Sequence, residues 1–224
     1  MNYDEGVVLL VNKPYEWTSF DVVKKIRNVT RAKKVGHAGT LDPLATGLLI
    51  VCTGKFTKQI SVIQDAEKEY TGTFYLGAIT PSADKETEEE EQFDISAITE
   101  EDIHGITKQF TGTIMQVPPL HSAVKVNGQR AYKIARRGED HQLEAKAVTI
   151  SEFDITEIKL PYIKFRVVCS KGTYIRSLAV DFGKALNAGA YLYDLCRIRI
   201  GEYQLKDAIE MKDVLTLRPV APEE

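Results

Sequence analysis

The hydrophobic positions near the start of this chain predict a strand followed by a helix. Residues 6–12 (GVVLLVN) form a short apolar run, which is typical of a buried strand. Pro14 ends this run, and Thr18 or Ser19 can cap a helix that follows. The apolar positions of that helix recur at helical spacing, and they are Val22, Val23, Ile26 and Val29.

The later strands are predicted by apolar, aromatic and β-branched residues. Residues 70–79 (YTGTFYLGAI) are the clearest example, because such residues suit a pleated, half-buried surface. The other strands are expected at residues 48–53, 113–115, 123–126, 148–158, 163–169 and 191–200. Of these, the strands at 148–158 and 163–169 are expected to pair with each other.

Three further helices are predicted among these strands. Thr99 can cap a helix that runs to Phe110, residues 129–137 are expected to form a basic helix, and residues 173–186 another helix. Strands and helices mix without a strict βαβ alternation. We therefore expect an α+β fold, with a mixed, mostly antiparallel sheet flanked by helices and loops, in one domain spanning residues 1–224.

Charge is distributed unevenly along the chain. The net charge of −3 argues mildly against a nucleic-acid partner. However, residues 24–34 carry six basic residues and no acid, residues 130–137 carry a second basic cluster, and residues 84–91 carry six acids in a predicted loop. Phosphate binding needs a local positive surface rather than a positive total. Solvated helix faces are the alternative, and charge alone favours that alternative.

Other features narrow the class of protein. The chain has no run of about 20 apolar residues, as a membrane-spanning helix needs. Its acidic first residues do not resemble a secretory signal, so we expect a cytoplasmic protein. The cysteines form no CxxC pair and the four histidines are scattered, so we expect no metal site.

The segment that could carry chemistry is residues 36–47 (GHAGTLDPLATG), which we predict to be a loop. Its glycines allow the backbone to approach a ligand closely, and Pro43 restricts Asp42 to extended geometry. A carboxylate would thus be held at the mouth of a sheet. The alternative is an ordinary turn in which Asp42 is a helix cap or makes an Asx-turn, and spacing alone favours that alternative.

A longer run around this loop resembles a known family. Residues 33–58, KKVGHAGTLDPLATGLLIVCTGKFTK, are similar to the bacterial TruB-type tRNA pseudouridine synthases. The similarity continues in the family's order over nearly the whole chain. It includes Lys13-Pro14, Thr18-Ser19, Lys68-Glu69-Tyr70, Pro118-Pro119, Ser122-Ala123, Lys125, Tyr132, Ala135-Arg136, Gly138, residues 171–176, Leu195, Arg197 and Gly201.

The resemblance implies a pseudouridine synthase fold and an isomerase that needs neither metal nor cofactor. Its substrate would be the uridine at position 55 in the T-loop of tRNA. The enzyme would flip the base out, break its C1′–N1 bond and rejoin it through C5. Asp42 would be the catalytic residue. It would either attack C1′ or remove a sugar proton to give a glycal, and the sequence leaves both routes open.

The resemblance also assigns roles to residues around Asp42. Arg176 would pair with Asp42, and Tyr70 would stack on the flipped base and could help to remove the C5 proton. The remaining pocket residues would be Tyr174 and Leu195 beside the nucleotide, His37 in the gap left by the flipped base, and Lys13 as a support of the loop. Ordinary core or surface positions are the alternative for each of these residues.

The basic clusters would then contact the RNA backbone without reading its sequence. The residues concerned are Lys24, Lys25, Arg31, Lys33, Lys34, Arg130, Lys133, Arg136 and Arg137. A segment near residues 118–145 resembles the part of the family that folds over the T-arm stem-loop. The chain departs from the family pattern at Glu16 and His121, and it ends too soon for a C-terminal PUA domain. We expect a monomer that binds tRNA and no membrane.

Two other functions fit the same residues. A non-catalytic tRNA-binding or folding chaperone would use the same basic clusters. A different enzyme on the same scaffold would act on another RNA.

Overall fold

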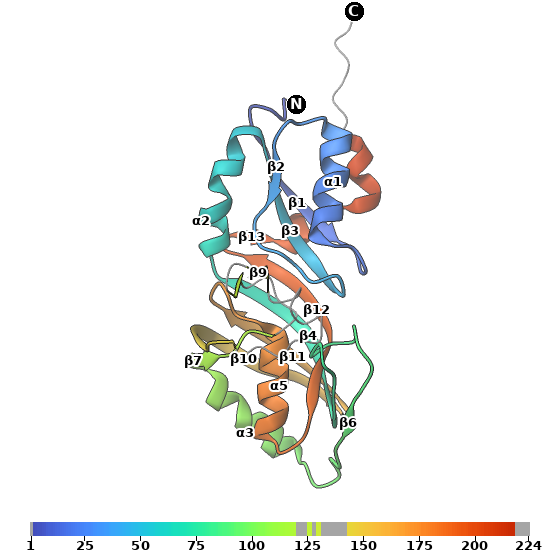
Figure 1. The fold of residues 1–224 in the computed structure, drawn as a ribbon, viewed down its shortest axis with the longest axis vertical. Coiled ribbons are helices and arrows are strands. Elements are labelled where there is room, and N and C mark those ends of the chain that lie inside the picture. Colours follow the sequence, from blue (N-terminus) through green and yellow to red (C-terminus); the bar gives the residue numbers. More distant parts are fainter. Residues whose placement is uncertain (1, 120–124, 127–128, 131–142, 218–224) are drawn as a thin grey trace, which may run out of the picture. The chain divides into compact units, whose positions relative to one another are not determined.

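The computed structural model describes residues 2–119, 125–126, 129–130 and 143–217 (Figure 1). The chain divides into two compact units, each of which contains strands and helices. Unit 1 comprises Met1–Tyr70 and Leu195–Glu224, and unit 2 comprises Thr71–Asp194. The division falls inside two strands, β4 (Lys68–Leu76) and β12 (Ala190–Ile200), so each unit contains part of both.

Unit 1 is built on a mixed sheet. Strand β1 (Val8–Lys13) pairs antiparallel with β3 (Ala45–Thr53) and parallel with β14 (Ile209–Glu210). Strand β3 also pairs parallel with β12 and antiparallel with β2 (Val35–His37). The short strand β13 (Tyr203–Gln204) extends β12 as a hairpin. The helices of this unit are α1 (Ser19–Thr30), α2 (Ile60–Asp65) and the 3₁₀ helices η1 (Gly54–Gln59), η2 (Leu205–Asp207) and η3 (Met211–Leu217).

Both faces of the sheet in unit 1 are covered. On β3, Leu49 and Val51 pack with α1 and η3, whereas Leu48 and Ile50 pack with η1 and α2. This division follows from the alternation of side chains along a strand. It also explains why β3 reads as a continuous apolar run, because a strand covered on both faces has no polar side.

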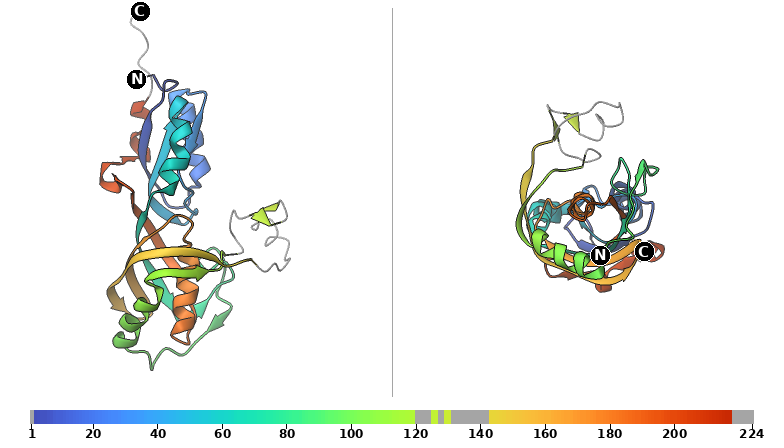
Figure 2. Two further views of the ribbon diagram at one scale, coloured as in Figure 1. Left: turned by 90° about the vertical axis from the view of Figure 1, so that its left-hand side faces the viewer. Right: turned by 90° about the horizontal axis from the view of Figure 1, so that it is seen from below.

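Unit 2 carries an antiparallel set of strands with two helices. Strand β11 (Tyr162–Cys169) pairs with β10 (Lys146–Lys159), which pairs with β7 (Gly112–Gln116). Helices α3 (Glu100–Phe110) and α5 (Ile175–Ala185) lie side by side (Figures 1 and 2). Two short hairpins complete the described elements, β5 (Ala78–Ile79) with β6 (Glu91–Gln92), and β8 (Lys125–Val126) with β9 (Gln129–Arg130).

Aromatic rings divide between the two faces of the strands in unit 2. Phe74 of β4 stacks on Phe165 with ring centroids 4.1 Å apart and lies 5.4 Å from Phe182 of α5. Its neighbour Tyr75 points the other way and stacks on Tyr191 at 5.0 Å. The phenylalanines therefore form the core under α5, and the tyrosines form the opposite face.

The predicted α+β class, with a mixed and mostly antiparallel sheet, is confirmed. So are the helices after Thr18, after Thr99 and near residue 175, and the pairing of β10 with β11. A capping box holds each of the first two helices at its start, through Thr18 with Asp21 and Thr99 with Asp102. Whether the chain acts as one catalytic domain stays a prediction.

Several details differ from the sequence prediction. The loop predicted at residues 36–47 is shorter, because backbone pairing with β3 extends β2 to His37 and β3 itself begins at Ala45. The strand predicted at 70–79 is interrupted at Gly77, whose φ of 96° ends β4. Helix α2 was not predicted. The basic helix predicted at 129–137 is wrong at its start, which forms β9, and its other residues lie outside the described part of the chain.

Candidate active site

The loop that carries Asp42 joins β2 to β3 in unit 1. The Asp42 carbonyl accepts a hydrogen bond from Ala45 N at 3.1 Å, so residues 42–45 form a turn with Pro43 in its second position. Before this turn, the Ser19 hydroxyl accepts from Leu41 N at 2.9 Å and lies 3.1 Å from Leu41 O. The start of α1 thus holds the backbone beside Asp42, whose side chain is partly exposed.

Lys13 supports the same loop from the end of β1. The side chain is fully buried, and its Nζ donates to the carbonyls of Pro14 (2.9 Å), Trp17 (2.6 Å) and Pro43 (3.1 Å). Burial lowers the pKa of Lys13 to about 8, while the nearby Asp42 carboxylate opposes this shift and Arg197 adds to it. A buried ammonium with three acceptors therefore fixes the backbone directly after Asp42.

Arg197 of β12 holds the loop from the other side. It is 1% exposed, and it donates from Nε to the Leu48 carbonyl at 2.8 Å and from Nη2 to the Gly39 carbonyl at 3.0 Å. These two carbonyls lie before and after Asp42 in the chain. Gly47 permits the close approach of β12, because it has a φ of 99° and a Cβ there would lie 2.4 Å from Arg197 O.

His37 lies at the end of β2, opposite Val51 in the strand pair. Burial lowers the pKa of His37, a hydrogen bond with the Gly39 backbone raises it, and Arg197 lowers it further. The Nδ1 atom is buried and has no hydrogen-bond partner within the described residues. The imidazole is therefore favoured in its neutral form at this position.

In unit 2, Arg176 lies in the first turn of α5 and is 4% exposed. Its Nη1 donates to the Ser82 carbonyl at 3.2 Å, and its Nε lies 3.7 Å from Asp84 Oδ2. Asp84 is itself buried, and the Thr80 and Ser82 hydroxyls donate to its carbonyl at 2.7 and 3.1 Å. Asp84 was predicted to belong to an acidic loop. Nothing in that run of acids distinguishes it, because its partner lies far away in the sequence.

Tyr174 is the N-cap residue of α5, and its backbone N–H donates to Gln116 Oε1 at 2.7 Å. The next contact between these segments joins the Ser177 hydroxyl to the Val117 carbonyl at 2.7 Å. Gln116 was also missed by sequence reasoning, since a single glutamine at a strand end carries no recognisable pattern.

The structure brings the predicted site residues together in two groups. In unit 1, Asp42 lies on the loop between β2 and β3, His37 lies just before this loop, and Lys13 supports it. Leu195 of the same unit pairs with Ala45 at the end of the loop, and Tyr70 is buried in β4. Arg176 and Tyr174 share the first turn of α5 in unit 2. The pairing of Asp42 with Arg176, and the orientation of Tyr70 toward the same cleft, stay predictions.

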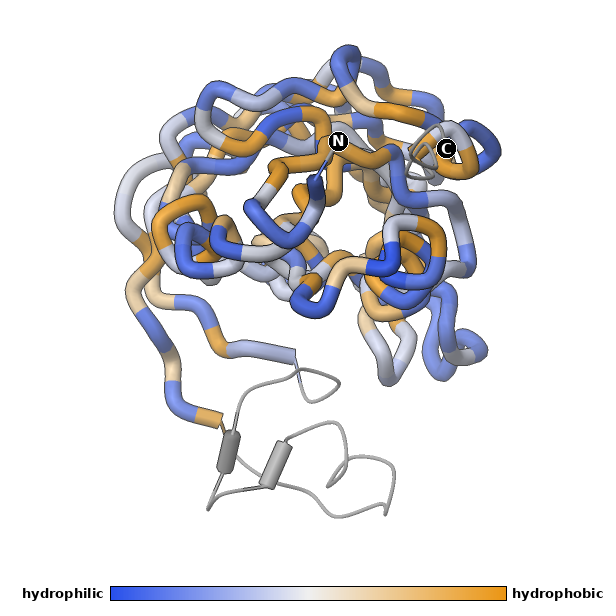
Figure 3. Tube along the Cα trace, turned by 90° about the horizontal axis from the view of Figure 1, so that it is seen from above, coloured by the Kyte–Doolittle hydropathy of each residue, from blue (hydrophilic) through white to orange (hydrophobic). Residues whose placement is uncertain are grey.

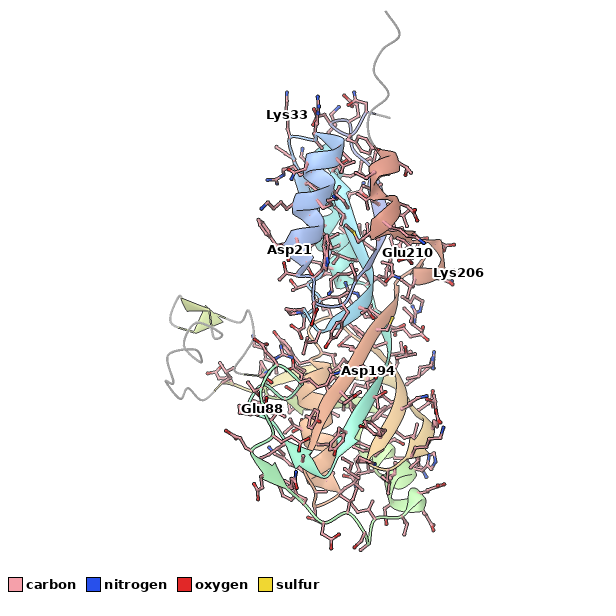
Figure 4. All side chains as sticks on the ribbon, turned by 90° about the vertical axis from the view of Figure 1, so that its right-hand side faces the viewer. Asp21, Lys33, Glu88, Asp194, Lys206 and Glu210 are labelled. Carbon is pink, nitrogen blue, oxygen red and sulfur yellow. The ribbon has the colours of Figure 1, made fainter. Side chains whose placement is uncertain are left out.

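Most of the predicted RNA-contacting residues of unit 1 face solvent. Lys24, Arg31, Lys33 and Lys34 are exposed on or just beyond α1, and Lys25 is partly exposed. Figure 4 shows Lys33 past the C-terminal end of this helix and Asp21 in its first turn. Lys133, Arg136 and Arg137 lie outside the described residues, as does the side chain of Arg130 in β9.

Comparison with known proteins decides the family. Residues 27–175 match the TruB family pseudouridylate synthase (N terminal domain). The chain belongs to the TruB family of pseudouridylate synthases. A tRNA pseudouridine synthase B from Flavobacterium johnsoniae is 56% identical, over 93% of this chain and 94% of that protein. Another from Phocaeicola vulgatus is 52% identical, over 95% of this chain and 93% of that protein. The TruB-family chain is therefore an isomerase, as predicted.

Solved structures confirm the pseudouridine synthase fold. The TruB-family chain is 30% identical to a chain of a Cbf5-Nop10-Gar1 complex, with a TM-score of 0.76. It is 27% identical, with a TM-score of 0.71, to a chain of an H/ACA RNP bound to a substrate RNA. In both comparisons 96% of this chain is covered, but it spans only about half of the solved chain, 55% and 54% respectively.

Within residues 2–119, 125–126, 129–130 and 143–217, no group of three or more His, Cys, Asp or Glu side chains is placed to hold a metal. No helix within these ranges is long and apolar enough to cross a membrane. Figure 3 shows hydrophobic and hydrophilic residues alternating along the trace.

Proposed function

We propose that this TruB-family chain converts the uridine at position 55 in the T-loop of tRNA to pseudouridine. The observation that carries the proposal is the Asp42 loop, which is held by two buried cations, Lys13 on one side and Arg197 on the other. A carboxylate on a braced loop suits a reaction at a sugar carbon. The relatives that match over nearly the whole chain are named as tRNA enzymes, which supports tRNA as the substrate class.

The reaction requires an ionised carboxylate beside a ribose whose base has left the helix. Asp42 serves either as a nucleophile at C1′ or as a base that removes a sugar proton. Both routes release the uracil from its C1′–N1 bond and rejoin it through C5, and the C5 proton then leaves. Arg176 would orient the Asp42 carboxylate, and Asp84 would in turn orient Arg176.

Binding would use contacts outside the reacting nucleotide. The exposed lysines and arginine of α1 and the residues after it would contact T-arm phosphates. Tyr70 would stack on the flipped uracil, Tyr174 and Leu195 would line its pocket, and His37 would fill the gap in the RNA. A segment near 118–145 would hold the T-arm. We also propose that the protein is a cytoplasmic monomer. Light scattering at micromolar concentration tests its oligomeric state.

Tritium release tests the chemistry directly. T-arm RNA labelled with tritium at uracil C5 loses its label to water when C5 bonds to C1′. The wild type should release tritium, and Asp42→Asn should release none. Asp207→Asn is the matched control, because Asp207 is an exposed aspartate in η2 of the same unit, and it should match the wild type. Equal release by Asp42→Asn and the wild type would refute the proposal.

A tRNA-folding chaperone is the second candidate, favoured by the exposed basic residues of α1. Such an activity depends on RNA binding and not on the carboxylate. It predicts that Asp42→Asn refolds misfolded tRNA as fast as the wild type. The chaperone and synthase activities can coexist on one chain. Action on another RNA is a separate alternative. It would be detected by mapping pseudouridines in RNA from a deletion strain, where that RNA would lack its pseudouridine.

A further inference from the structure

Gln116 occupies an unusual place for a glutamine. It ends β7, it is 2% exposed, and its Oε1 accepts the backbone N–H of Tyr174 at 2.7 Å. Its Nε2 is buried and has no hydrogen-bond partner within the described residues. A buried, unpaired donor destabilises a fold by about 1–3 kcal/mol. An apolar side chain of similar size would avoid that penalty, but it would remove the acceptor of the Tyr174 N–H.

The contact made by Gln116 falls at the start of α5. The N-cap residue Tyr174 makes no side-chain capping hydrogen bond, so the first turn of this helix depends on partners from other segments. Gln116 binds the N-cap N–H, and Val117 accepts from the Ser177 hydroxyl. The last residue of β7 and the residue after it therefore hold the turn between Tyr174 and Ser177.

That turn carries Arg176, which is held on its other side by Asp84 and the Ser82 carbonyl. The guanidinium is thus fixed by its own contacts, while its backbone is fixed by β7. A shift of the backbone would move the guanidinium even with Asp84 in place. A small misplacement of a catalytic group can slow a reaction a hundredfold.

We propose that Gln116 is a positioning residue for catalysis, which sets the first turn of α5 through the Tyr174 N–H and thereby aims Arg176 and Tyr174. This inference rests on the proposed function of the Asp42 site. It assigns Gln116 an effect on the chemical step and not on RNA affinity or folding. The Oε1 acceptor is the atom that matters, because it accepts the Tyr174 N–H.

The test compares variants in single-turnover tritium release with enzyme in excess over T-arm RNA. Gln116→Met removes the acceptor and keeps the volume, and we expect the rate to fall at least about tenfold, or 1.4 kcal/mol in the barrier. Gln116→Glu keeps the acceptor oxygen, and it should recover most of the rate. Gln109→Met alters an exposed glutamine on α3 and should match the wild type.

Two further measurements separate positioning from structure. The affinity of Gln116→Met for T-arm RNA should stay within about threefold of the wild type, and its thermal midpoint within a few degrees. A Gln116→Met rate within twofold of the wild type would overturn the inference. So would a rate loss matched by an equal loss of RNA affinity, or a loss that Gln116→Glu shares in full. Absence of release by the wild type itself would instead refute the proposed function.

Discussion

Individual residues decide how the Asp42 loop is held. Lys13 and Arg197 are both buried and both donate to backbone carbonyls of that loop and its flanks. Buried cations are stabilised mainly by such hydrogen bonds, and removing them leaves several carbonyls unpaired. Both side chains are almost completely shielded from solvent, so their contribution is to fix the backbone around one carboxylate.

The shifted pKa of Lys13 predicts how stability varies with pH. In the folded chain this pKa is about 8, whereas the ordinary value is 10.5. Between these values the unfolded chain binds more protons at this site, so its contribution to stability rises with pH. Below pH 8 both states are charged, and the contribution is constant.

The measurement is the free energy of unfolding in urea from pH 7 to pH 10.5, for the wild type and Lys13→Met. The difference, wild type minus variant, should increase above about pH 8, because titration of all other groups cancels. A difference that is flat or falls across this range would contradict the assignment.

Asp84 predicts a second effect at the residue scale. Asp84→Asn removes the charge that faces the buried Arg176 guanidinium and weakens the contact that orients it. We expect tritium release to fall by at least about tenfold, with T-arm affinity little changed. Glu88→Gln, an exposed acid in the same run, is the control and should retain the wild-type rate. An unchanged rate in Asp84→Asn would exclude its role in orienting Arg176.

At the scale of elements, two of the predicted helices have local start signals. Helices α1 and α3 each begin with a threonine whose hydroxyl accepts the N–H three residues on, and an aspartate there bonds back to the threonine backbone. These signals act over four residues, so no tertiary contact is needed to read them. Strand β2 was not predicted, because three residues paired with β3 leave no periodic pattern.

The capping box of α3 yields a prediction about stability alone. Thr99→Ala removes the hydroxyl that accepts the Asp102 N–H, and we expect the free energy of unfolding to fall by about 1 kcal/mol. Thr99→Ser retains the hydroxyl and should lose much less. Chemical denaturation measures both variants, and tritium release by each folded variant should equal that of the wild type.

At the scale of the whole molecule, charge is segregated even though its total is slightly negative. The basic residues of α1 and the segment after it are mostly exposed in unit 1, whereas the acidic run of residues 84–91 belongs to unit 2. A local positive surface is sufficient for phosphate binding, because the interaction is screened within about 8–10 Å at physiological salt. The net charge of −3 therefore does not oppose an RNA substrate.

Salt dependence tests this surface. Lys33→Gln and Lys34→Gln should each weaken binding of T-arm RNA. Each should also reduce the slope of log affinity against log salt by up to about one, the value for one lost phosphate contact. Lys206→Gln, at an exposed lysine in η2 (Figure 4), should leave the slope unchanged. Anisotropy titrations at several salt concentrations measure the slope, and equal slopes in all proteins would remove the segment after α1 from the interface.

The order of residues alone was enough to predict the α+β class, the helices after Thr18 and Thr99, and the segment around Asp42. Each of these depends on residue spacing or on a contiguous run of residues, which a sequence displays directly. Only the tertiary structure revealed the contacts of Arg197, Asp84 and Gln116. Arg197 reaches carbonyls 149 and 158 residues away, and Gln116 reaches a backbone N–H 58 residues away. Such contacts arise when strands and helices pack, and no local pattern encodes which distant atom a buried polar group will meet.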